Sequence, residues 1–445
     1  MSDRFSIGQC SRREYMTAIA ATSGVAFGAA GCLGFRSDGG KPAAVEDTLY
    51  SPPEGEPTPG SMYPRVTRLE HGSSDGTQGP LLATFEFYPS MSGGSVPYFP
   101  VYRSTDGGRT WSEYSEIHDT SGKDWGLRYQ PTLFELPQSV GPWSAGTVLA
   151  AGNAIPILDA PEEVPEGAIG ELGETSIDLY ASTDGGESWE YVSTVVTGGT
   201  AVPHEGNNPV WEPELGLDAD GNLVCYFADE RMGTDDDYNQ LVAYKASDDG
   251  GQTWGDEQFV AAIPNGTTRP GMPSVTSLPD DTYMITYEVV GPEYLHGEVH
   301  VKTSPDGRDW GDPSDVGTLV STADGRRFVN GPHVTWTSAG GDDGTILISG
   351  KQLVDGNREP AEGNGEVVLA NSNLDGSGDW EPVDAPLSFE TESELGGRTF
   401  VGWTTPLLPS RRGDELLQMT STAADSELCE ISYGVESLNL DDDGT

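Results

Sequence analysis

Apolar and polar residues alternate along much of the chain in short runs, such as those within ATFEF, YFADER and MITYE. Runs of this kind, bounded by clusters of glycine, aspartate and proline, are typical of β-strands. The strand signals fall into six groups, at residues 63–117, 128–196, 209–261, 271–316, 328–384 and 402–436. Six such groups in one chain indicate an all-β repeat architecture, in which each sheet buries its faces against the neighbouring sheets.

An eight-residue motif recurs between the strands. It reads STDGGRTW at 104–111, STDGGESW at 182–189 and SDDGGQTW at 247–254, with a shorter copy, SPDGRDW, at 304–310 and a degenerate one at 372–380. The aspartate can accept backbone N–H groups of its own turn, glycine supplies a positive φ, and tryptophan can pack over the turn. The alternating oxygen ligands and distal glutamate of a calcium loop are missing. The motif therefore predicts a structural hairpin.

These repeats resemble the Asp-box of the sialidase-like propeller superfamily. The resemblance implies a six-bladed β-propeller of four-stranded antiparallel sheets with Asp-box hairpins. We expect a strand near residues 48–50 to complete the last sheet, because ring closure leaves no open edge. Asp-boxes also occur in propellers without known catalysis, so the motif by itself predicts the fold and not an activity.

The N-terminal segment carries an export signature. A twin arginine, Arg12-Arg13, precedes a weakly apolar run that ends in Ala-Ala-Gly-Cys32, which is typical of a Tat signal with a lipoprotein cleavage site. This predicts a signal peptide at 1–31, a lipid on Cys32, and a protein tethered to the outer face of the cell membrane. Residues 32–60 are rich in proline, glycine and acid and predict a flexible tether, followed by the propeller at 61–445.

The chain is strongly acidic, with 72 Asp and Glu against 23 Lys and Arg and a formal net charge of −49. This charge excludes nucleic-acid binding by phosphate neutralisation and argues against docking on anionic lipid, so the predicted membrane contact is only the anchor at Cys32. Because the acids are spread along the chain, we interpret them as a halophilic, solvated surface. Cys225 and Cys429 fall in blades three and six and are expected to be buried and unpaired. We expect a monomer.

Strand order predicts where a ligand would bind. If the first strand of each blade descends from the top face, the Asp-box turns lie at the bottom, and first-strand starts and second-strand ends meet at the top around the axis. The charged and polar residues at these positions form the predicted site: catalytic Glu212 and Glu288, and substrate-binding Arg65, Arg128, Asp229, Arg231, Arg269, His333 and Trp403. Glu86, Gln130, Asn153, Glu230 and Lys351 occupy similar positions.

Glu212 and Glu288 are the strongest candidates, because apolar or aromatic residues flank each of them in adjacent blades. Two such carboxylates are what glycoside hydrolysis needs: one with a raised pKa protonates the leaving oxygen, and the other attacks the anomeric carbon or activates water. Neither a metal nor an organic cofactor is required by this chemistry, and the sequence contains no H-E-x-x-H, Walker or dinucleotide motif.

The segments VWEPEL, YFADER, RPGMPSVTSLPDDTYMITYE and GPHVTWTSAGGDDGTILISG resemble family 93 of the glycoside hydrolases, six-bladed exo-arabinanases. The resemblance implies an exo-acting retaining glycosidase with a carbohydrate substrate, with Glu212 as acid/base and Glu288 as nucleophile. The assisting tyrosine expected in that family is not placed by the sequence. Two alternatives remain: a non-catalytic propeller that binds carbohydrate or protein, and a divergent sialidase, although the arginine triad of sialidases is only loosely echoed around Arg65.

Overall fold

The computed structural model describes residues 43–53, 60–71, 78–87, 96–156, 174–201, 207–232, 237–295, 297–391, 400–424 and 428–440. The predicted signal peptide, Cys32 and the first part of the predicted tether lie outside these residues. Within the described ranges, no helix is long and apolar enough to cross a membrane.

The strands of the first three blades pair in chain order, each antiparallel to the next. Blade one comprises β2 (Ser61–Arg68), β3 (Leu81–Phe87), β4 (Phe99–Ser104) and β5 (Ser112–Ile117). Blade two comprises β6 (Trp125–Glu135), β7 (Val148–Pro156), β8 (Glu174–Ser182) and β9 (Glu190–Thr200). Blade three comprises β10 (Val210–Leu217), β11 (Leu223–Asp229), β12 (Leu241–Ser247) and β13 (Gln258–Ala261).

The other three blades follow the same plan with shorter outer strands. Blade four comprises β14 (Arg269–Ser277), β15 (Tyr283–Val290), β16 (Glu298–Ser304) and β17 (Thr318–Leu319), and the short β18 (Arg327–Val329) and β21 (Gln352–Val354) extend its sheet. Blade five comprises β19 (His333–Thr337), β20 (Thr345–Ser349), β22 (Val367–Asn371) and β23 (Glu381–Asp384). Blade six comprises β24 (Leu407–Pro409), β25 (Glu415–Ala423), β26 (Cys429–Ser437) and β1 (Val45–Tyr50). The predicted all-β, six-bladed propeller is confirmed in the described part of the chain.

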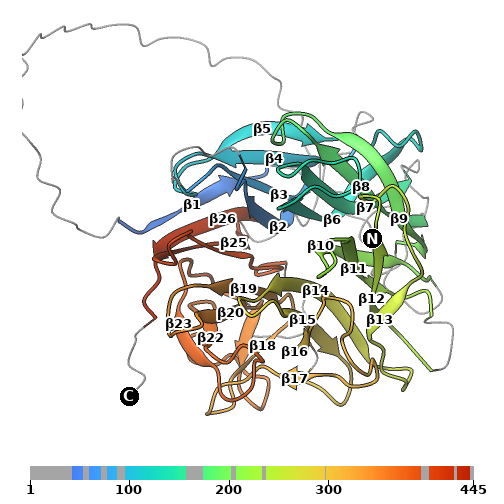
Figure 1. The fold of residues 1–445 in the computed structure, drawn as a ribbon. Coiled ribbons are helices and arrows are strands. Elements are labelled where there is room, and N and C mark those ends of the chain that lie inside the picture. Colours follow the sequence, from blue (N-terminus) through green and yellow to red (C-terminus); the bar gives the residue numbers. More distant parts are fainter. Residues whose placement is uncertain are drawn as a thin grey trace, which may run out of the picture. The chain divides into compact units, whose positions relative to one another are not determined.

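Strand β1 closes the ring. It pairs antiparallel with β26, from Val45 opposite Val435 to Tyr50 opposite Ile431, as expected for a strand near residues 48–50. Residues 45–50 therefore belong to the sixth sheet, although the sequence placed them within the tether at 32–60. Figure 1 shows β1 beside β26 and the first strands of the blades, among them β2, β6, β10, β14 and β19, gathered around the axis.

The hydrophobic core is divided among the blade interfaces. In the described residues, each of the six pairs of neighbouring blades has its own cluster of buried apolar side chains. A further cluster lies at the axis and includes Tyr63, Tyr129, Trp211 and Met272. This is the packing of a repeat fold, in which every sheet is covered by its two neighbours. Cys225 and Cys429 are buried and free, as predicted.

The Asp-box motifs form the turns between the third and fourth strands. In blade one, Asp106 accepts hydrogen bonds from the backbone N–H groups of Arg109 (3.1 Å) and Thr110 (2.9 Å), and Ser104 donates to it at 2.8 Å. Ser104 pairs with Leu81 at the start of β3, whereas Glu86 at its other end pairs with Met62. The boxes and the predicted site therefore lie at opposite ends of the sheets, as expected.

A backbone feature repeats at the start of every blade. Six of the ten described non-glycine residues with a positive φ, the left-handed region that side chains disfavour, lie in or just before the first strand of a blade, one at each blade: Tyr63, Gln130, Glu212, Met272, Asn330 and Thr404, with φ between 54° and 61°. In β2, β6, β10 and β14 the register shifts around this residue, which marks a β-bulge. A bulge redirects a side chain, and in these four strands the redirected residue lies at the axial cavity.

Candidate active site

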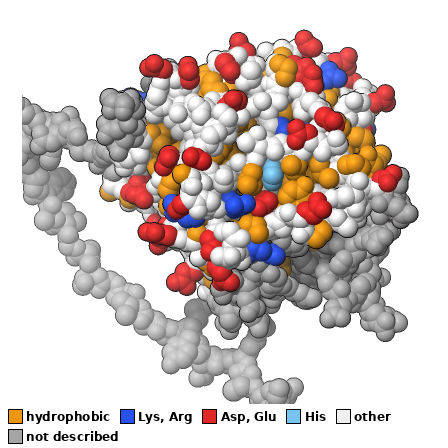
Figure 2. All heavy atoms as spheres, turned by 90° about the horizontal axis from the view of Figure 1, so that it is seen from below, with side chains coloured by type: hydrophobic (Ala, Val, Ile, Leu, Met, Phe, Trp, Pro, Cys, Tyr) orange, Lys and Arg blue, Asp and Glu red, His pale blue; other side chains and the backbone are white. Residues whose placement is uncertain are grey.

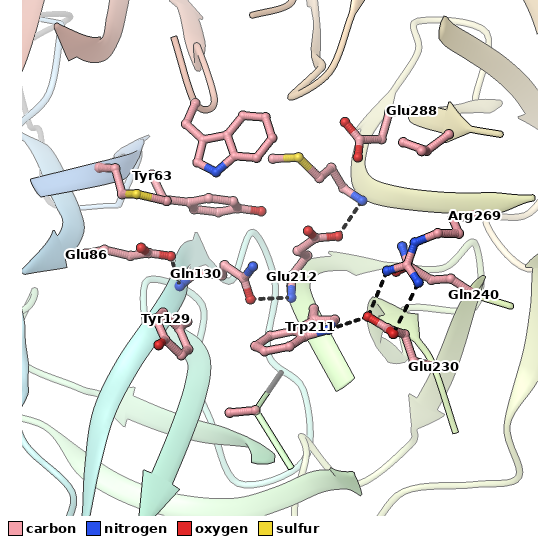
Figure 3. Close-up of a pocket in the computed structure, with 15 residues that line it drawn as sticks. Tyr63, Glu86, Tyr129, Gln130, Trp211, Glu212, Glu230, Gln240, Arg269 and Glu288 are labelled. Carbon is pink, nitrogen blue, oxygen red and sulfur yellow. Dashed lines mark hydrogen bonds and ion pairs between the residues drawn. The ribbon is translucent and has the colours of Figure 1, made fainter. Parts of the chain in front are cut away.

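A cavity of about 210 Å³ opens at the axis where these bulges meet (Figure 3). The bulge residues Tyr63, Gln130, Glu212 and Met272 all line it. The ends of the second strands contribute Glu86, Glu230 and Glu288, and the remaining wall includes Met62, Tyr129, Ala201, Trp211, Gln240, Arg269, Val290 and Trp403. Aromatic rings with a few convergent polar groups are the composition expected of a small-molecule site.

Glu212 is held by the bulge that it occupies. Its φ is 61°, its backbone N–H donates to the amide oxygen of Gln130 at 3.1 Å, and its carboxylate accepts the backbone N–H of Met272 at 2.5 Å. A non-glycine residue in this conformation is strained by on the order of 1–3 kcal/mol and persists only where its surroundings fix it. Burial and the negative charge of Glu288 raise the pKa of Glu212 to about 8, so its carboxyl is protonated at neutral pH.

Glu288 lies at the end of β15 in the neighbouring blade, and Figure 3 shows its carboxylate pointing into the same cavity as that of Glu212. It accepts hydrogen bonds from the side chain of Asn330 and from the backbone N–H of Gly331, both at 3.1 Å. Burial raises the pKa of Glu288, and these two donors, together with the charges of Lys351 and Arg269, act against that rise. The surroundings of Glu288 therefore favour a carboxylate more than those of Glu212 do.

Arg269 is the one arginine among the described residues that line the cavity, and its donors are engaged by protein groups. It donates to both carboxylate oxygens of Glu230, at 2.9 and 3.2 Å. It also donates to the side-chain oxygens of Asn239 and Gln240, both at 2.6 Å. Glu230 accepts the indole N–H of Trp211 at 2.8 Å as well. This network fixes the wall behind Glu212 and leaves the cavity, with its four glutamates, net negative.

Aromatic side chains form the rest of the wall. The rings of Tyr129 and Trp211 meet edge to face with centroids 5.9 Å apart. Trp403 lies across the axis, with the ammonium group of Lys351 4.1 Å from its ring centroid. Figure 3 shows the hydroxyl group of Tyr63 pointing into the cavity. Such rings offer flat apolar surfaces to a sugar. Within the described residues, no group of three or more His, Cys, Asp and Glu side chains is placed to hold a metal ion.

Glu212, Glu288, Arg269 and Trp403 are thus brought together as the sequence predicted, whereas Arg65 and Arg128 are not. Arg65 is buried behind the wall, where its guanidinium lies 4.5 Å from the ring centroid of Tyr63 and donates to the hydroxyl oxygen at 3.2 Å. Arg128 is buried beside Tyr129. In both strands the bulge residue, and not the arginine two positions away, takes the place at the cavity.

Asp229, Arg231 and His333 also lie outside the cavity wall. Asp229 and Arg231 form a bidentate ion pair at 2.8 and 2.9 Å, and Arg231 contacts Glu257 as well. Alternation along the strand places Asp229 away from the cavity and the next residue, Glu230, in its wall. The ring of His333 accepts the backbone N–H of Leu407 at 3.3 Å. Burial and the nearby charge of Arg65 lower the pKa of His333 to about 3, so its ring is neutral.

The sequence did not single out Tyr63, Tyr129, Trp211, Gln240 or Met272 as site residues. One signal was available: Tyr63, Gln130, Glu212 and Met272 each immediately precede a proline at the start of a first strand. A proline restricts the backbone conformation of the residue before it. A proline at the same place in four blades therefore indicates that these blades share a local backbone conformation.

Comparisons with known proteins agree with this geometry. A family model described as the BNR/Asp-box repeat matches residues 102–113. No match was found among curated protein sequences. The α-L-arabinanase of Penicillium chrysogenum, solved with arabinobiose, is 31% identical over 89% of this chain and 99% of that chain, with a TM-score of 0.71. The family 93 α-L-arabinofuranosidase of Fusarium graminearum, also solved with arabinobiose, is 28% identical over 88% and 97%, with a TM-score of 0.70.

A sialidase of Streptococcus pneumoniae is more distant, at 13% identity over 87% of this chain and 70% of that chain, with a TM-score of 0.50; this likeness concerns the fold alone. The similarity to the arabinanase and to the arabinofuranosidase, by contrast, extends over nearly the whole length of each. With its propeller fold and a pair of glutamates in the axial cavity, the chain is a glycosidase and belongs to glycoside hydrolase family 93.

Proposed function

We propose that the protein removes a short sugar unit from the end of an arabinan-type oligo- or polysaccharide, with retention at the anomeric carbon. The observation that carries this proposal is the asymmetry between two glutamates at one cavity. Burial raises the pKa of both: that of Glu212 reaches about 8, so Glu212 is protonated at neutral pH, while at Glu288 two hydrogen-bond donors and two nearby cations act against the rise and favour the charged form. This is the pairing of an acid with a nucleophile that double-displacement hydrolysis requires.

In the first step the carboxyl group of Glu212 gives its proton to the glycosidic oxygen as the bond to the anomeric carbon breaks. The carboxylate of Glu288 attacks that carbon from the opposite face and forms a glycosyl ester, and the rest of the chain leaves as an alcohol. In the second step the carboxylate of Glu212 takes a proton from water, whose oxygen displaces Glu288. Two inversions give net retention, and Glu212 regains its proton.

The proposed substrate class rests on the charge of the cavity and on the ligands of the related enzymes. A cavity with four glutamates, whose arginine is engaged by Glu230, Asn239 and Gln240, suits a neutral sugar. The same features disfavour a sialidase, since sialic acid carries a carboxylate that needs free cationic groups. Both family relatives were solved with arabinobiose, which supports an arabinofuranosyl chain end as the ligand and an exo mode of attack.

Product analysis on linear arabinan and a panel of aryl glycosides, run in high salt, tests the proposal. We expect one short product from the first minutes of digestion, and proton NMR should show the anomer of the substrate before mutarotation. Glu288→Gln should abolish hydrolysis with the fold retained. In Glu212→Ala, azide should restore turnover of an aryl arabinofuranoside and yield a glycosyl azide of retained configuration. A product of inverted configuration would overturn the mechanism.

The alternative of a binding propeller without catalysis makes a different prediction. Under that alternative the parent protein would release no sugar from any member of the panel, and Glu288→Gln would bind arabinan as the parent does. Release of sialic acid from a generic substrate, with arabinan left intact, would favour the sialidase alternative instead.

A further inference from the structure

Gln130 occupies an unusual place between two of the glutamates. It is the bulge residue of β6, with a φ of 54°, and it lines the cavity between Glu86 and Glu212. Its backbone N–H donates to a carboxylate oxygen of Glu86 at 2.8 Å, and its side-chain oxygen accepts the backbone N–H of Glu212 at 3.1 Å. Both its main chain and its side chain are therefore fixed from neighbouring blades.

The same pattern continues around the axis. In the next two blades, a backbone N–H at the blade start is likewise accepted by a side chain of the preceding blade: that of Met272 by Glu212 at 2.5 Å, and that of Gly331 by Glu288 at 3.1 Å. Gln130 is the uncharged member of this series, in which the other acceptors are Glu86, Glu212 and Glu288. The peptide that carries Glu212 is thus held by a neutral acceptor, whereas a carboxylate at this position would raise the pKa of Glu212 further.

The orientation of the Gln130 amide follows from its partner. The atom that faces the N–H of Glu212 must be the oxygen, because an NH₂ group cannot accept that hydrogen bond. The NH₂ group then lies on the other branch of the amide, and Figure 3 shows it on the side of Tyr63 and the Glu212 carboxylate. It is a neutral donor in a wall whose other polar groups are mainly carboxylates.

We propose that Gln130 is a positioning residue for Glu212 and a specificity residue for the sugar. Its amide oxygen holds the strained Glu212 peptide so that the carboxyl faces the glycosidic oxygen, and its NH₂ group donates to a hydroxyl group of the neutral sugar bound beside it. Binding of the sugar and placement of the acid are then coupled through one amide group. This inference rests on the proposed role of Glu212 as the acid.

Two variants separate these roles. Gln130→Met keeps the length of the side chain but removes both the acceptor and the donor, so we expect kcat/KM to fall about 100-fold, with kcat reduced at least tenfold. Gln130→Glu keeps an acceptor for the N–H of Glu212, so kcat should return to within about threefold of the parent. Its added negative charge should also move the alkaline limb of kcat/KM to higher pH, because it raises the pKa of Glu212 further.

Steady-state kinetics on the aryl glycoside that the parent hydrolyses fastest provide the measurement, with Gln138→Met as the matched control. Gln138 is exposed and lies near the opposite end of the same blade, so its replacement should change neither constant. Peptide-level hydrogen exchange gives a readout independent of turnover: the amide of Glu212 should be protected in the parent and in Gln130→Glu, and exposed in Gln130→Met.

The outcomes are distinct. Parent kinetics and parent protection in Gln130→Met would overturn the inference, as would equal impairment of the Met and Glu variants, which indicates a role in packing only. If the parent hydrolyses a glycoside other than an arabinoside, the proposed substrate is wrong, but the comparison of the two variants still decides the role of Gln130.

Discussion

Glu212 and Glu288 are the same residue type at one cavity, and burial raises the pKa of both, but the hydrogen-bond donors and cations around Glu288 act against that rise. In the proposed mechanism Glu212 donates a proton, so activity should fall as pH rises through its pKa of about 8. The profile of kcat/KM reports ionisations of the free enzyme, and we expect its alkaline limb near that value. Protonation of Glu288 removes the nucleophile and should set the acidic limb.

The measurement is kcat/KM against pH at constant salt on an aryl arabinofuranoside with a good leaving group. Such a substrate leaves without protonation, so Glu212→Gln should retain the first step and lose the alkaline limb. An unchanged alkaline limb in that variant would assign the limb to another group.

The raised pKa of Glu212 also affects stability. Its carboxyl has a pKa of about 8 in the folded protein against an ordinary value of 4.5, so between these values the folded state binds more protons than the unfolded state. The free energy of unfolding therefore falls as pH rises through this window. Glu212→Gln removes the titrating group, and the variant should gain on the order of a few kcal/mol over the parent by pH 8.

Thermal unfolding from pH 4.5 to 9 checks this stability difference, which should grow through the window and level off above it. Glu381→Gln, an exposed carboxylate on β23, is the control and should follow the parent curve. A constant difference between Glu212→Gln and the parent at every pH would contradict the linkage.

The sequence predicted the members of the site unevenly, and the bulges explain why. Arg65 and Arg128 were predicted from their position at the start of a first strand, but a bulge shifts the register there, and Tyr63 and Gln130 line the cavity instead. Glu212 was predicted because apolar and aromatic residues flank it at the start of a first strand, within a segment that resembles a known family, and it is itself the bulge residue. A register shift of this kind depends on contacts between blades, which strand propensity does not encode.

At the scale of elements, the Asp-box made the division into blades predictable from the sequence, because it marks the turn between the third and fourth strands of a blade. The strand groups, with Trp-containing turns in five of them, were sufficient to assign the six blades. Each such turn is determined locally by its own serine, aspartate and glycine. The short strands β18 and β21, which join blade four, were not predicted. They have three residues each, and their pairing is decided by the neighbouring sheet.

The Asp-box should contribute to stability and not to catalysis, and blade three offers adjacent residues to test it. Asp249 accepts hydrogen bonds from the backbone N–H of Thr253 (2.9 Å), from its hydroxyl (2.6 Å) and from Ser247 (2.8 Å), whereas Asp248 beside it is exposed. Asp249→Ala should lower the free energy of unfolding by about 1–3 kcal/mol. Asp248→Ala should change it by less than about 0.5 kcal/mol.

Urea unfolding measures both variants, and kcat should match the parent in each, because the turn lies at the end of the sheet opposite the cavity. A loss of kcat in Asp249→Ala without a loss of stability would contradict this prediction, because it would give the Asp-box a catalytic role.

Strand β1 provides a second test at this scale. Val45, Leu49 and Tyr50 pack against the apolar cluster between blades six and one, and the ring of Tyr50 lies 5.2 Å from that of Phe85. A chain that begins at residue 52 loses these contacts and exposes the edge of β26. Its melting temperature should fall by about 5 °C or more relative to a chain that begins at residue 43. Equal melting of the two chains would show that β1 is dispensable for closure.

At the scale of the whole molecule, charge dominates. Figure 2 shows acidic side chains spread over the visible face of the propeller, with few basic ones among them, and the full chain carries a formal net charge of −49. Mutual repulsion of this size destabilises the compact state. The Debye length shrinks from about 10 Å at 0.1 M salt to about 3 Å at 1 M, so added salt screens the repulsion between neighbouring carboxylates.

We therefore expect the unfolding midpoint to rise steeply between 0.1 and 1 M KCl and to flatten above that range, because screening saturates once the Debye length is shorter than the spacing of the charges. Exclusion of solute from the protein surface also stabilises folded proteins, but its effect grows steadily with concentration. A titration with sucrose separates the two and should give a continuous, shallower rise. A midpoint that does not change between 0.1 and 2 M KCl would contradict the interpretation of this surface as adapted to high salt. The acidic residues would then need another explanation. The apolar interfaces between blades hold the propeller together, and repulsion between unscreened carboxylates does not add to that stability.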